Sequence, residues 1–339
     1  MLRSSNNMKN YPRHHVILTV ALVGLIGAFA LLPGPARFAS AQVVSPSWAT
    51  TLRSLAPVPD PAGSLSTNYD CTQIDVPGAT VTGAMGINAR GDITGQFTDT
   101  NNVIHGWLLP KDGSIIVLDH PNSTRNSALA INSEGLVAGN WEDATHQRRG
   151  FLWKGGRFSD VQFPGSSFTS ATSINDRGDV AGQYILAGQN HGFLLSNGVY
   201  STVDVPGATA TSIFGLSNDG ELCGNYSVGT GPAVVMHGFL LFGDGLMTVD
   251  WPRATLPASF NSARGIAPDG NIVVGSYHGP NTTATHGYIL GDDALTNFDY
   301  PAAGVTSTAI FGVNSQGAFV GGFNVGSVSA TFQHGYVCR

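Results

Sequence analysis

The run HGFLLSNGVYSTVDVPG, residues His191–Gly207, decides the fold of this chain. It begins with a His-Gly-aromatic triplet, contains Asn197-Gly198 in its middle and ends at Pro206-Gly207. Asn-Gly between two runs of β-forming residues is a strong signal for a tight hairpin. Proline ends a strand because it cannot donate to the hydrogen-bond ladder. The run therefore predicts two antiparallel strands, about His191–Leu195 and Val199–Val205.

The same triplet recurs along the chain at a near-even spacing. Its six copies, one of which begins with arginine, are His105-Gly106-Trp107, Arg149-Gly150-Phe151, His191-Gly192-Phe193, His237-Gly238-Phe239, His286-Gly287-Tyr288 and His334-Gly335-Tyr336. The gaps between their glycines are 44, 42, 46, 49 and 48 residues. Periods of this length indicate propellers, solenoids or other repeat arrays.

A second repeated motif precedes each triplet. In the third repeat it is SINDRGDVAG, Ser173–Gly182, a turn of the form Asn-x-x-Gly between two short apolar runs. Asparagine suits the start of a type I turn, and glycine accepts the left-handed position that follows. The motif thus predicts a hairpin with strands at about Ser170–Asn175 and Asp179–Ile185. An aromatic residue stands two positions after the motif in every repeat: Phe97, Trp141, Tyr184, Tyr226, Tyr277 and Phe323.

Each repeat therefore supplies four short antiparallel strands. Four strands in about 45 residues is the size of one propeller blade. No helical periodicity follows the N-terminal segment. We predict an all-β fold, a six-bladed β-propeller of four-stranded antiparallel blades.

The two ends of the chain are expected to build the last blade together. The chain stops at HGYVCR, His334–Arg339, after the third strand of the sixth repeat. The missing fourth strand is found at the start of the domain, where YDCTQIDVPG, Tyr69–Gly78, matches Tyr200–Gly207. The N-terminal strand would thus complete the last blade and close the ring.

The cysteines fit this closure. Cys338 stands at the place of Leu195, and Cys71 stands at the place of Tyr200. Because those two places should face each other across the hairpin turn, Cys71 and Cys338 should be cross-strand neighbours within reach of a disulfide. The alternative is two unpaired small hydrophobic residues. Cys223 is expected to be buried without a partner.

The first 41 residues resemble a secretion signal. Basic residues precede the apolar run Val16–Leu32, and Ala39-Ser40-Ala41 offers a small-residue cleavage site. We predict a signal peptide over 1–41, with an uncleaved N-terminal anchor as the alternative, a Pro-containing linker without a β pattern over 42–65, and the propeller over 66–339. Whether the N-terminal segment is cleaved or stays as an anchor, the domain is expected in an oxidising compartment, where disulfides persist. The predicted location is extracellular, with the periplasm or the cell surface as alternatives.

The mature chain is acidic. The whole sequence has 16 Lys and Arg against 22 Asp and Glu, and cleavage after Ala41 removes four of the basic residues, which leaves 12 against 22 and a net charge of −10. An acidic surface argues against nucleic acid and anionic membranes as partners. We expect a monomer without a cofactor or membrane insertion, whose partner is an extracellular glycan or protein.

The hairpin motif and the His-small-aromatic motif resemble those of the HAF-repeat group of extracellular repeat proteins. The resemblance covers about Tyr69–Arg339. The namesake motif of that family has alanine in the middle, where this chain has glycine in all six copies. The resemblance implies secretion and a repeat architecture, and it implies no activity and no catalytic residues.

The repeated polar and aromatic residues are interpreted as structural. Equivalent histidines on six blades lie on a ring and cannot converge on one ion, so we expect each to hydrogen-bond a neighbouring strand or blade edge and predict no metal site. The aromatic residues are expected to pack between blades, with a platform for sugars as the alternative. The repeated asparagines are expected to be turn residues: Asn88, Asn132, Asn175 and Asn314.

Specificity should lie where the repeats differ. In a propeller of this topology, the second-to-third and fourth-to-first connections lie on one face. The candidate ligand-binding residues there are Asp99, Asn101, Arg125, Glu142, Asp143, His146, Arg253 and His278. Paired carboxylates can bind a cation or act as the acid and base of glycoside hydrolysis. The simpler interpretation is ordinary solvated loop charge.

The predicted function is a secreted, non-catalytic binding or structural module, and no catalytic residue is assigned. The first alternative is an extracellular polysaccharide hydrolase or lyase that uses Asp99, Glu142, Asp143 and His146. No nucleophile, zinc, calcium or phosphate-binding motif is present. The second alternative is a cell-surface scaffold held by an uncleaved N-terminal helix.

Overall fold

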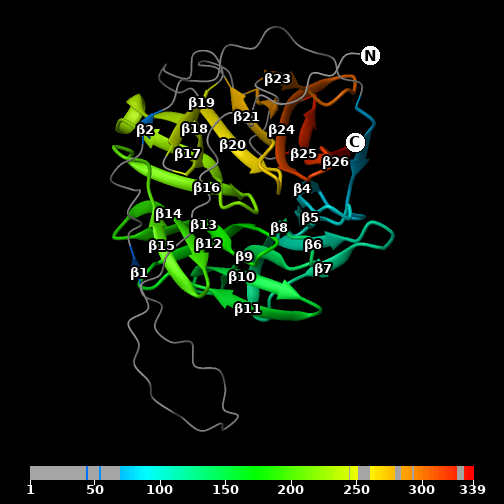
Figure 1. The fold of residues 1–339 in the computed structure, drawn as a ribbon. Coiled ribbons are helices and arrows are strands. Elements are labelled where there is room, and N and C mark those ends of the chain that lie inside the picture. Colours follow the sequence, from blue (N-terminus) through cyan, green and yellow to red (C-terminus); the bar gives the residue numbers. More distant parts are fainter. Residues whose placement is uncertain are drawn as a thin grey trace.

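A computed structural model describes eight segments of the chain, which consist mainly of β-strands (Figure 1). The segments are residues 43–44, 53–54, 69–243, 245–250, 260–278, 284–291, 294–326 and 332–339. Within these segments the only helix is the 3₁₀ turn η3 (Gly231–Ala233), and no helix is long and apolar enough to cross a membrane. The predicted all-β class is confirmed.

The strands form six antiparallel sets of four, in which strand a pairs with b, b with c, and c with d. Set 1 consists of β4 (Val81–Ile87), β5 (Ile93–Thr98), β6 (Ile104–Leu109) and β7 (Ile116–Leu118). Set 2 consists of β8 (Ser123–Ile131), β9 (Val137–Asp143), β10 (Arg148–Lys154) and β11 (Arg157–Val161). Set 3 consists of β12 (Phe168–Ile174), β13 (Val180–Leu186), β14 (Gln189–Ser196) and β15 (Val199–Val203). Set 4 consists of β16 (Ala210–Leu216), β17 (Leu222–Val228), β18 (Val235–Phe242) and β19 (Gly245–Val249). Set 5 consists of β20 (Phe260–Ile266), β21 (Ile272–His278), β22 (His286–Gly291) and β23 (Ala294–Phe298). Set 6 consists of β24 (Val305–Val313), β25 (Phe319–Val325), β26 (His334–Cys338) and β3 (Cys71–Ile74). One parallel residue pair joins set 2 to set 3, and another joins set 4 to set 5.

The hairpin that led the sequence analysis has the expected geometry. Leu195 faces Tyr200 across β14 and β15. Asn197 and Gly198 have φ values of 51° and 77°, and a two-residue hairpin turn of the type I′ class needs positive φ at both positions. The residue pair Asn-Gly is therefore present because it tolerates this backbone.

The two ends of the chain meet in set 6, as predicted. Strand β3 pairs with β26, and Cys71 lies opposite Cys338. A disulfide joins them across a sequence separation of 267 residues. In the chain-entropy model a loop of this length contributes about 5 kcal/mol to the free energy of unfolding. Cys223 is buried and unpaired, also as predicted.

A hydrophobic core lies between each set and the next. Six clusters of buried side chains are found among the described residues, and each cluster draws on two neighbouring sets. One of them joins the two ends of the series, because Val320 and Val337 of set 6 pack with Ala84 and Trp107 of set 1. Set 6 and set 1 therefore share a core in the same way as consecutive sets do.

Strand a of every set contains a β-bulge at the same place. A bulge adds one residue to a strand and redirects its side chain. The six a strands encircle the middle of the molecule (Figure 1). They approach closely there: a Cβ atom added to Gly312 of set 6 would lie 2.8 Å from the carbonyl oxygen of Met85 in set 1. Only glycine fits at such a distance.

Two short strands lie in the segment that the sequence analysis predicted to be a linker without a β pattern. Strand β1 (Val43–Val44) pairs in parallel with β15, and β2 (Arg53–Ser54) pairs in parallel with β19. Both partners are outermost strands of their sets, and an edge strand offers unpaired backbone groups to any extended segment. The predicted signal peptide and the rest of the predicted linker lie outside the described residues.

Candidate functional site

In the five triplets that begin with histidine, the histidine contacts an aspartate at the end of strand d in the same set. The distances between Nδ1 and the nearer carboxylate oxygen are 2.7 Å for His105–Asp119, 2.7 Å for His191–Asp204, 2.6 Å for His237–Asp250, 2.9 Å for His286–Asp299 and 3.1 Å for His334–Asp75. The expected bond to a neighbouring strand is thus confirmed. These aspartates were not among the predicted site residues. The available signal was an Asp-x-Pro motif that repeats in step with the triplet, as in Asp204-Val205-Pro206. The described residues hold no group of three or more His, Cys, Asp or Glu side chains suited to a metal ion.

The repeated aromatic residues pack between sets. The ring of Tyr184 stacks at 5.2 Å on His191 of its own set and at 3.6 Å on Phe163 of the preceding set. Tyr300 and Phe323 make the equivalent contact between sets 5 and 6, at 4.0 Å. With both faces covered, the Tyr184 ring is not free to stack on a sugar. The packing interpretation is confirmed.

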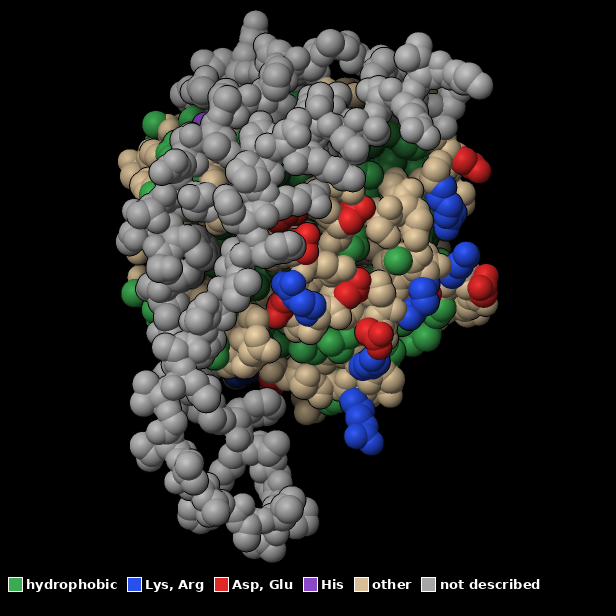
Figure 2. All heavy atoms as spheres, in the orientation of Figure 1, with side chains coloured by type: hydrophobic (Ala, Val, Ile, Leu, Met, Phe, Trp, Pro, Cys, Tyr) green, Lys and Arg blue, Asp and Glu red, His purple; other side chains and the backbone are tan. Residues whose placement is uncertain are grey.

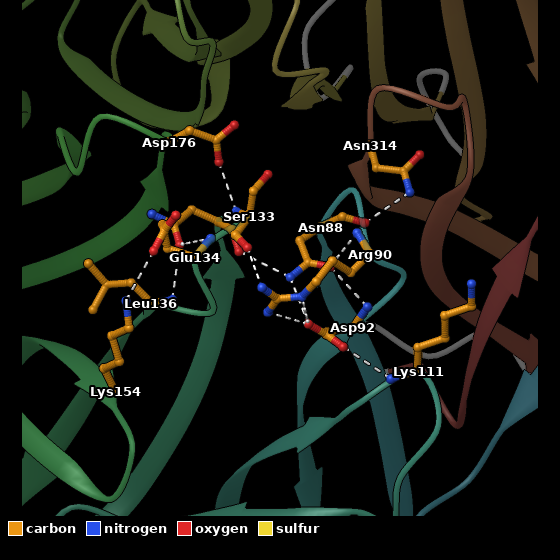
Figure 3. A network of polar contacts seen from close by, with 11 residues as sticks. Asn88, Arg90, Asp92, Lys111, Ser133, Glu134, Leu136, Lys154, Asp176 and Asn314 are labelled. Carbon is orange, nitrogen blue, oxygen red and sulfur yellow. Dashed lines mark hydrogen bonds and ion pairs between the residues drawn. The ribbon is translucent and has the colours of Figure 1, made fainter.

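The repeated asparagines hold the a–b turns and also join neighbouring sets (Figure 3). The side-chain oxygen of Asn88 accepts hydrogen bonds from the backbone N–H groups of Arg90 and Asp92, each at 3.0 Å. Its Nδ2 donates to the carbonyl of Asn132 in the next set at 3.0 Å. Asn314 of set 6 donates in the same way to the carbonyl of Asn88 in set 1, at 3.0 Å. The turn interpretation is confirmed, and the link between sets is an additional role.

Set 2 departs from the repeat at two partnered positions. Arg149 replaces the triplet histidine, and Gln162 replaces the aspartate. Arg149 donates instead to Asp143, at 2.8 Å, and its guanidinium lies 5.3 Å from the centre of the Trp141 ring. Both partners of the repeated pair have changed together, so the local contact is replaced and not lost.

A cluster of charged side chains lies at the b–c end of set 2. We call it the set 2 cluster and define it as Arg125, Glu142, Asp143, His146 and Arg148. Glu142 is buried; its Oε1 lies 2.8 Å from His146 Nδ1, and its Oε2 accepts a hydrogen bond from Arg148 at 2.9 Å. The bonds from His146 and Arg148, with the charge of Arg125, lower the pKa of Glu142.

Asp143 is held by its own loop. Its Oδ1 accepts hydrogen bonds from the N–H and hydroxyl of Thr145 and from the N–H of Gln147. These bonds, with the bond from Arg149, lower the pKa of Asp143 strongly. Asp143 therefore stays ionised and is fully engaged as an acceptor.

The other candidates lie elsewhere. In set 1, Asp99 accepts hydrogen bonds from the N–H groups of Asn101 and Val103, at 2.9 and 2.8 Å, and these bonds lower its pKa. In set 5, His278 stacks on Phe260 at 5.2 Å. Arg253 lies outside the described residues. The structure brings together Arg125, Glu142, Asp143 and His146, and no hydrogen bond or ion pair in the described part of the chain joins Asp99 to them.

The carboxylates of the site are poorly suited to acid catalysis. A glycosidase needs a carboxylic acid whose pKa is raised so that it can donate a proton near neutral pH. Asp99, Glu142 and Asp143 instead all have a lowered pKa, because each accepts several hydrogen bonds. These carboxylates are therefore poor proton donors near neutral pH, whereas an ionised carboxylate can still accept a proton or bind a cation.

Comparison with known proteins supports the fold alone. No family model matches the chain, and no curated protein matches it by sequence. The structure is similar to TolB from Acinetobacter baumannii, with a TM-score of 0.50 and 8% identity, over 73% of this chain and 63% of TolB. The chain thus matches less than two thirds of that protein. AofleA from Arthrobotrys oligospora has a TM-score of 0.48 and 12% identity, over 80% of this chain and 89% of that protein. The β-propeller domain of the trilobed protease from Pyrococcus furiosus has a TM-score of 0.42 and 10% identity, over 72% and 79%. The solved structures that the chain resembles are β-propellers.

Proposed function

We propose that this protein is a secreted, non-catalytic β-propeller that binds an acidic extracellular glycan at the set 2 cluster. The six sets are the six blades of this propeller, and set 6 closes the ring. Three contacts support closure: the shared core of sets 6 and 1, the bond from Asn314 to Asn88, and the Cys71–Cys338 disulfide. The disulfide and the N-terminal sequence support secretion, and membership of the HAF-repeat group stays part of the proposal.

The single observation that carries the proposed site is the ordered charge of the set 2 cluster. Arg148 is fixed by Glu142 and lies over the Phe168 ring at 5.4 Å. Arg125 is exposed on the neighbouring strand, where it lies opposite Glu142. His146 is 86% exposed. The guanidinium of Arg148 is therefore already positioned, which lowers the entropy cost of binding.

Charge favours an acidic glycan as the ligand. The cluster together with Arg149 has three arginines against two carboxylates, whereas the mature chain has a net charge of −10. The cluster therefore has a small local excess of positive charge on an acidic protein, and a guanidinium binds carboxylate or sulfate groups through two parallel hydrogen bonds. The loops of the same face would add neutral contacts to sugar hydroxyls.

The test is a binding measurement on the mature protein with acidic and neutral oligosaccharides. Arg125→Ala should weaken binding of the acidic glycan about tenfold, in line with about 1.4 kcal/mol for one charge-assisted contact. Arg157→Ala is the matched control, because Arg157 is an exposed arginine at the opposite end of the same set. Equal losses in the two variants, or equal binding of neutral and acidic glycans, would contradict the proposed site.

A further inference from the structure

The six bulges send six side chains toward the axis of the molecule. The bulge residues are Met85, Leu129, Thr172, Phe214, Arg264 and Phe311. All six line one axial cavity of about 70 Å³. Five of them are uncharged, and Arg264 is the single cation. The sequence signal was one charged residue at a repeat position that is otherwise neutral.

Arg264 makes no hydrogen bond or ion pair with the residues that the structure describes, and the polar group that affects its charge is the Tyr288 side chain. Its Nε is buried without an acceptor, and no carboxylate contributes to its electrostatic surroundings. The rest of the side chain is half-buried in the cavity wall. Burial lowers the pKa of Arg264 to about 10, so the group is still a cation at neutral pH. A buried N–H donor without an acceptor is costly, and an unsatisfied donor in a cavity calls for a ligand or water.

The guanidinium of Arg264 lies over three aromatic rings. The guanidinium carbon lies 4.5 Å from the centre of the Phe214 ring, 5.7 Å from that of Phe260 and 5.8 Å from that of Phe311. Such contacts stabilise a cation through the ring faces and do not use its N–H groups. The N–H donors of a guanidinium form a planar fork that matches the shape of a planar carboxylate.

The mouth of the cavity restricts the charge of any ligand. It is lined by Asp176, Asp219 and Asp269, and it shares residues with the axial cavity. Figure 2 shows acidic side chains close to the middle of the molecule in this view. Hydrogen bonds from Asn218 and Ser133 lower the pKa of Asp176 against the opposing effect of its burial, so this carboxylate stays ionised. These charges repel dianions more than monoanions.

We propose that the axial cavity binds a small organic monocarboxylate through Arg264. The carboxylate accepts hydrogen bonds from the guanidinium edge, and a short apolar tail packs against Met85, Leu129 and Phe311. A cavity of about 70 Å³ has room for about five non-hydrogen atoms, since one water needs about 10–15 Å³ on the same measure. Propionate is a suitable probe of this size. The site is independent of the set 2 cluster.

The experiment titrates the mature protein with propionate and follows the melting temperature, Tm. Saturable binding at 100 times Kd should raise Tm by about 5 °C, from the linkage relation and the usual size scaling. Propionamide has the same shape without the charge and should have no effect. Phosphate should bind more weakly because of the aspartates at the mouth. An equal shift with propionamide or with phosphate would overturn the proposed ligand class.

The matched variants are Arg264→Met and Arg177→Met. Methionine is the native residue at the bulge of set 1, so Arg264→Met should fold and lose the propionate shift. Arg177 is an exposed arginine in the a–b turn of set 3, and its variant should keep the shift. A shift that survives in Arg264→Met would contradict the site.

A measurement on the native protein covers the case in which Arg264→Met does not fold. In saturation-transfer NMR, irradiation of aromatic protons should reach the methyl group of propionate, because Phe214 and Phe311 line the cavity. The Arg177→Met protein should give the same transfer. Absence of transfer at millimolar propionate would mean that the rings alone hold Arg264 and that the cavity binds no carboxylate.

Discussion

Sets 2 and 3 are neighbours with the same four strands, yet their b–c ends differ. Set 3 keeps the repeated pair His191–Asp204, whereas set 2 has Arg149 and Gln162 at those places. Set 2 also carries Glu142, bonded to two basic side chains. The axial halves of the two sets are alike, with a bulge and a buried asparagine in each. The contacts between neighbouring sets are therefore the same in the two sets, whereas the residues at the b–c end differ.

We expect the largest loss of stability when the disulfide that joins the two chain ends in set 6 is removed. The double variant Cys71→Ser/Cys338→Ser should lower the free energy of unfolding by about 2–5 kcal/mol, because the unfolded chain gains entropy when the loop is opened. Denaturant unfolding of the oxidised protein and the variant measures this difference. Peptide mapping without reduction should recover the Cys71–Cys338 link. A link to Cys223 would contradict the structure.

A large loss is also expected from the asparagine of set 3. Asn175 is buried; its oxygen accepts from the N–H groups of Arg177 and Asp179, and its Nδ2 donates to Ser217 of set 4. Asn175→Ala should cost about 3 kcal/mol, since each buried group left without a partner costs about 1–3 kcal/mol.

The control for Asn175→Ala is Asn101→Ala, in an exposed loop at the other end of set 1. Chemical denaturation of both variants should show a loss below about 0.5 kcal/mol for the exposed position. Equal losses would mean that the links between sets contribute nothing beyond the turn itself.

A smaller effect is expected when set 2 is made to resemble set 3. The pair Arg149→His/Gln162→Asp restores the repeated contact at the expense of the bonds that Arg149 makes. We expect its Tm to stay within about 3 °C of the native value, because one local pair replaces another. Arg149→His alone should be less stable than the double variant. A double-mutant cycle measures the coupling, and additive single effects would show that the two positions did not change together.

The smallest effect concerns pH. The hydrogen bond that the Nδ1–H group of His286 donates to the Asp299 carboxylate raises the pKa of His286 above its usual value near 6.5. The folded state therefore binds the proton more tightly, and the added stability is fully present below about pH 6.5 and is lost as the pH rises through the folded pKa. Set 2 has arginine in place of histidine at this position. NMR titration of His286 should show the raised pKa, and Asp299→Asn should return it toward the usual value; an unchanged pKa in that variant would exclude the aspartate as its cause.

Much of the fold was predictable because it depends on local and periodic signals. Asn197-Gly198 requires a hairpin for reasons of backbone conformation, and Pro206 ends a strand because it lacks an N–H group. The place of Cys71 and Cys338 followed from the register of a neighbouring repeat. The aspartate partners of the histidines were missed because a hydrogen bond between strands c and d is not visible from the spacing of either motif alone.

The candidate site was predictable only in part. Sequence divergence pointed to Glu142 and His146, and they do lie together. Divergence also pointed to Asp99 and His278, which belong to sets 1 and 5 and make separate local contacts. Loop residues of different repeats can be compared in sequence, but the distance between them in space depends on how whole sets pack together. The short strands β1 and β2 were missed for the same reason, since their pairing uses the free edges of distant strands.

By itself, the sequence determined the β class and the four strands of each repeat, because hairpins and strand ends are fixed by contacts within a few tens of residues. It also predicted the pairing of the chain ends, whose cysteines are 267 residues apart, because the intact third repeat supplied the register. Only the tertiary structure decided what lies on the axis. The bulge that turns Arg264 inward is a feature of strand pairing. Its isolation among three aromatic rings arises from three different strands brought to one place. No local pattern can specify such a site, because the free energy of a buried charge depends on every group that surrounds it.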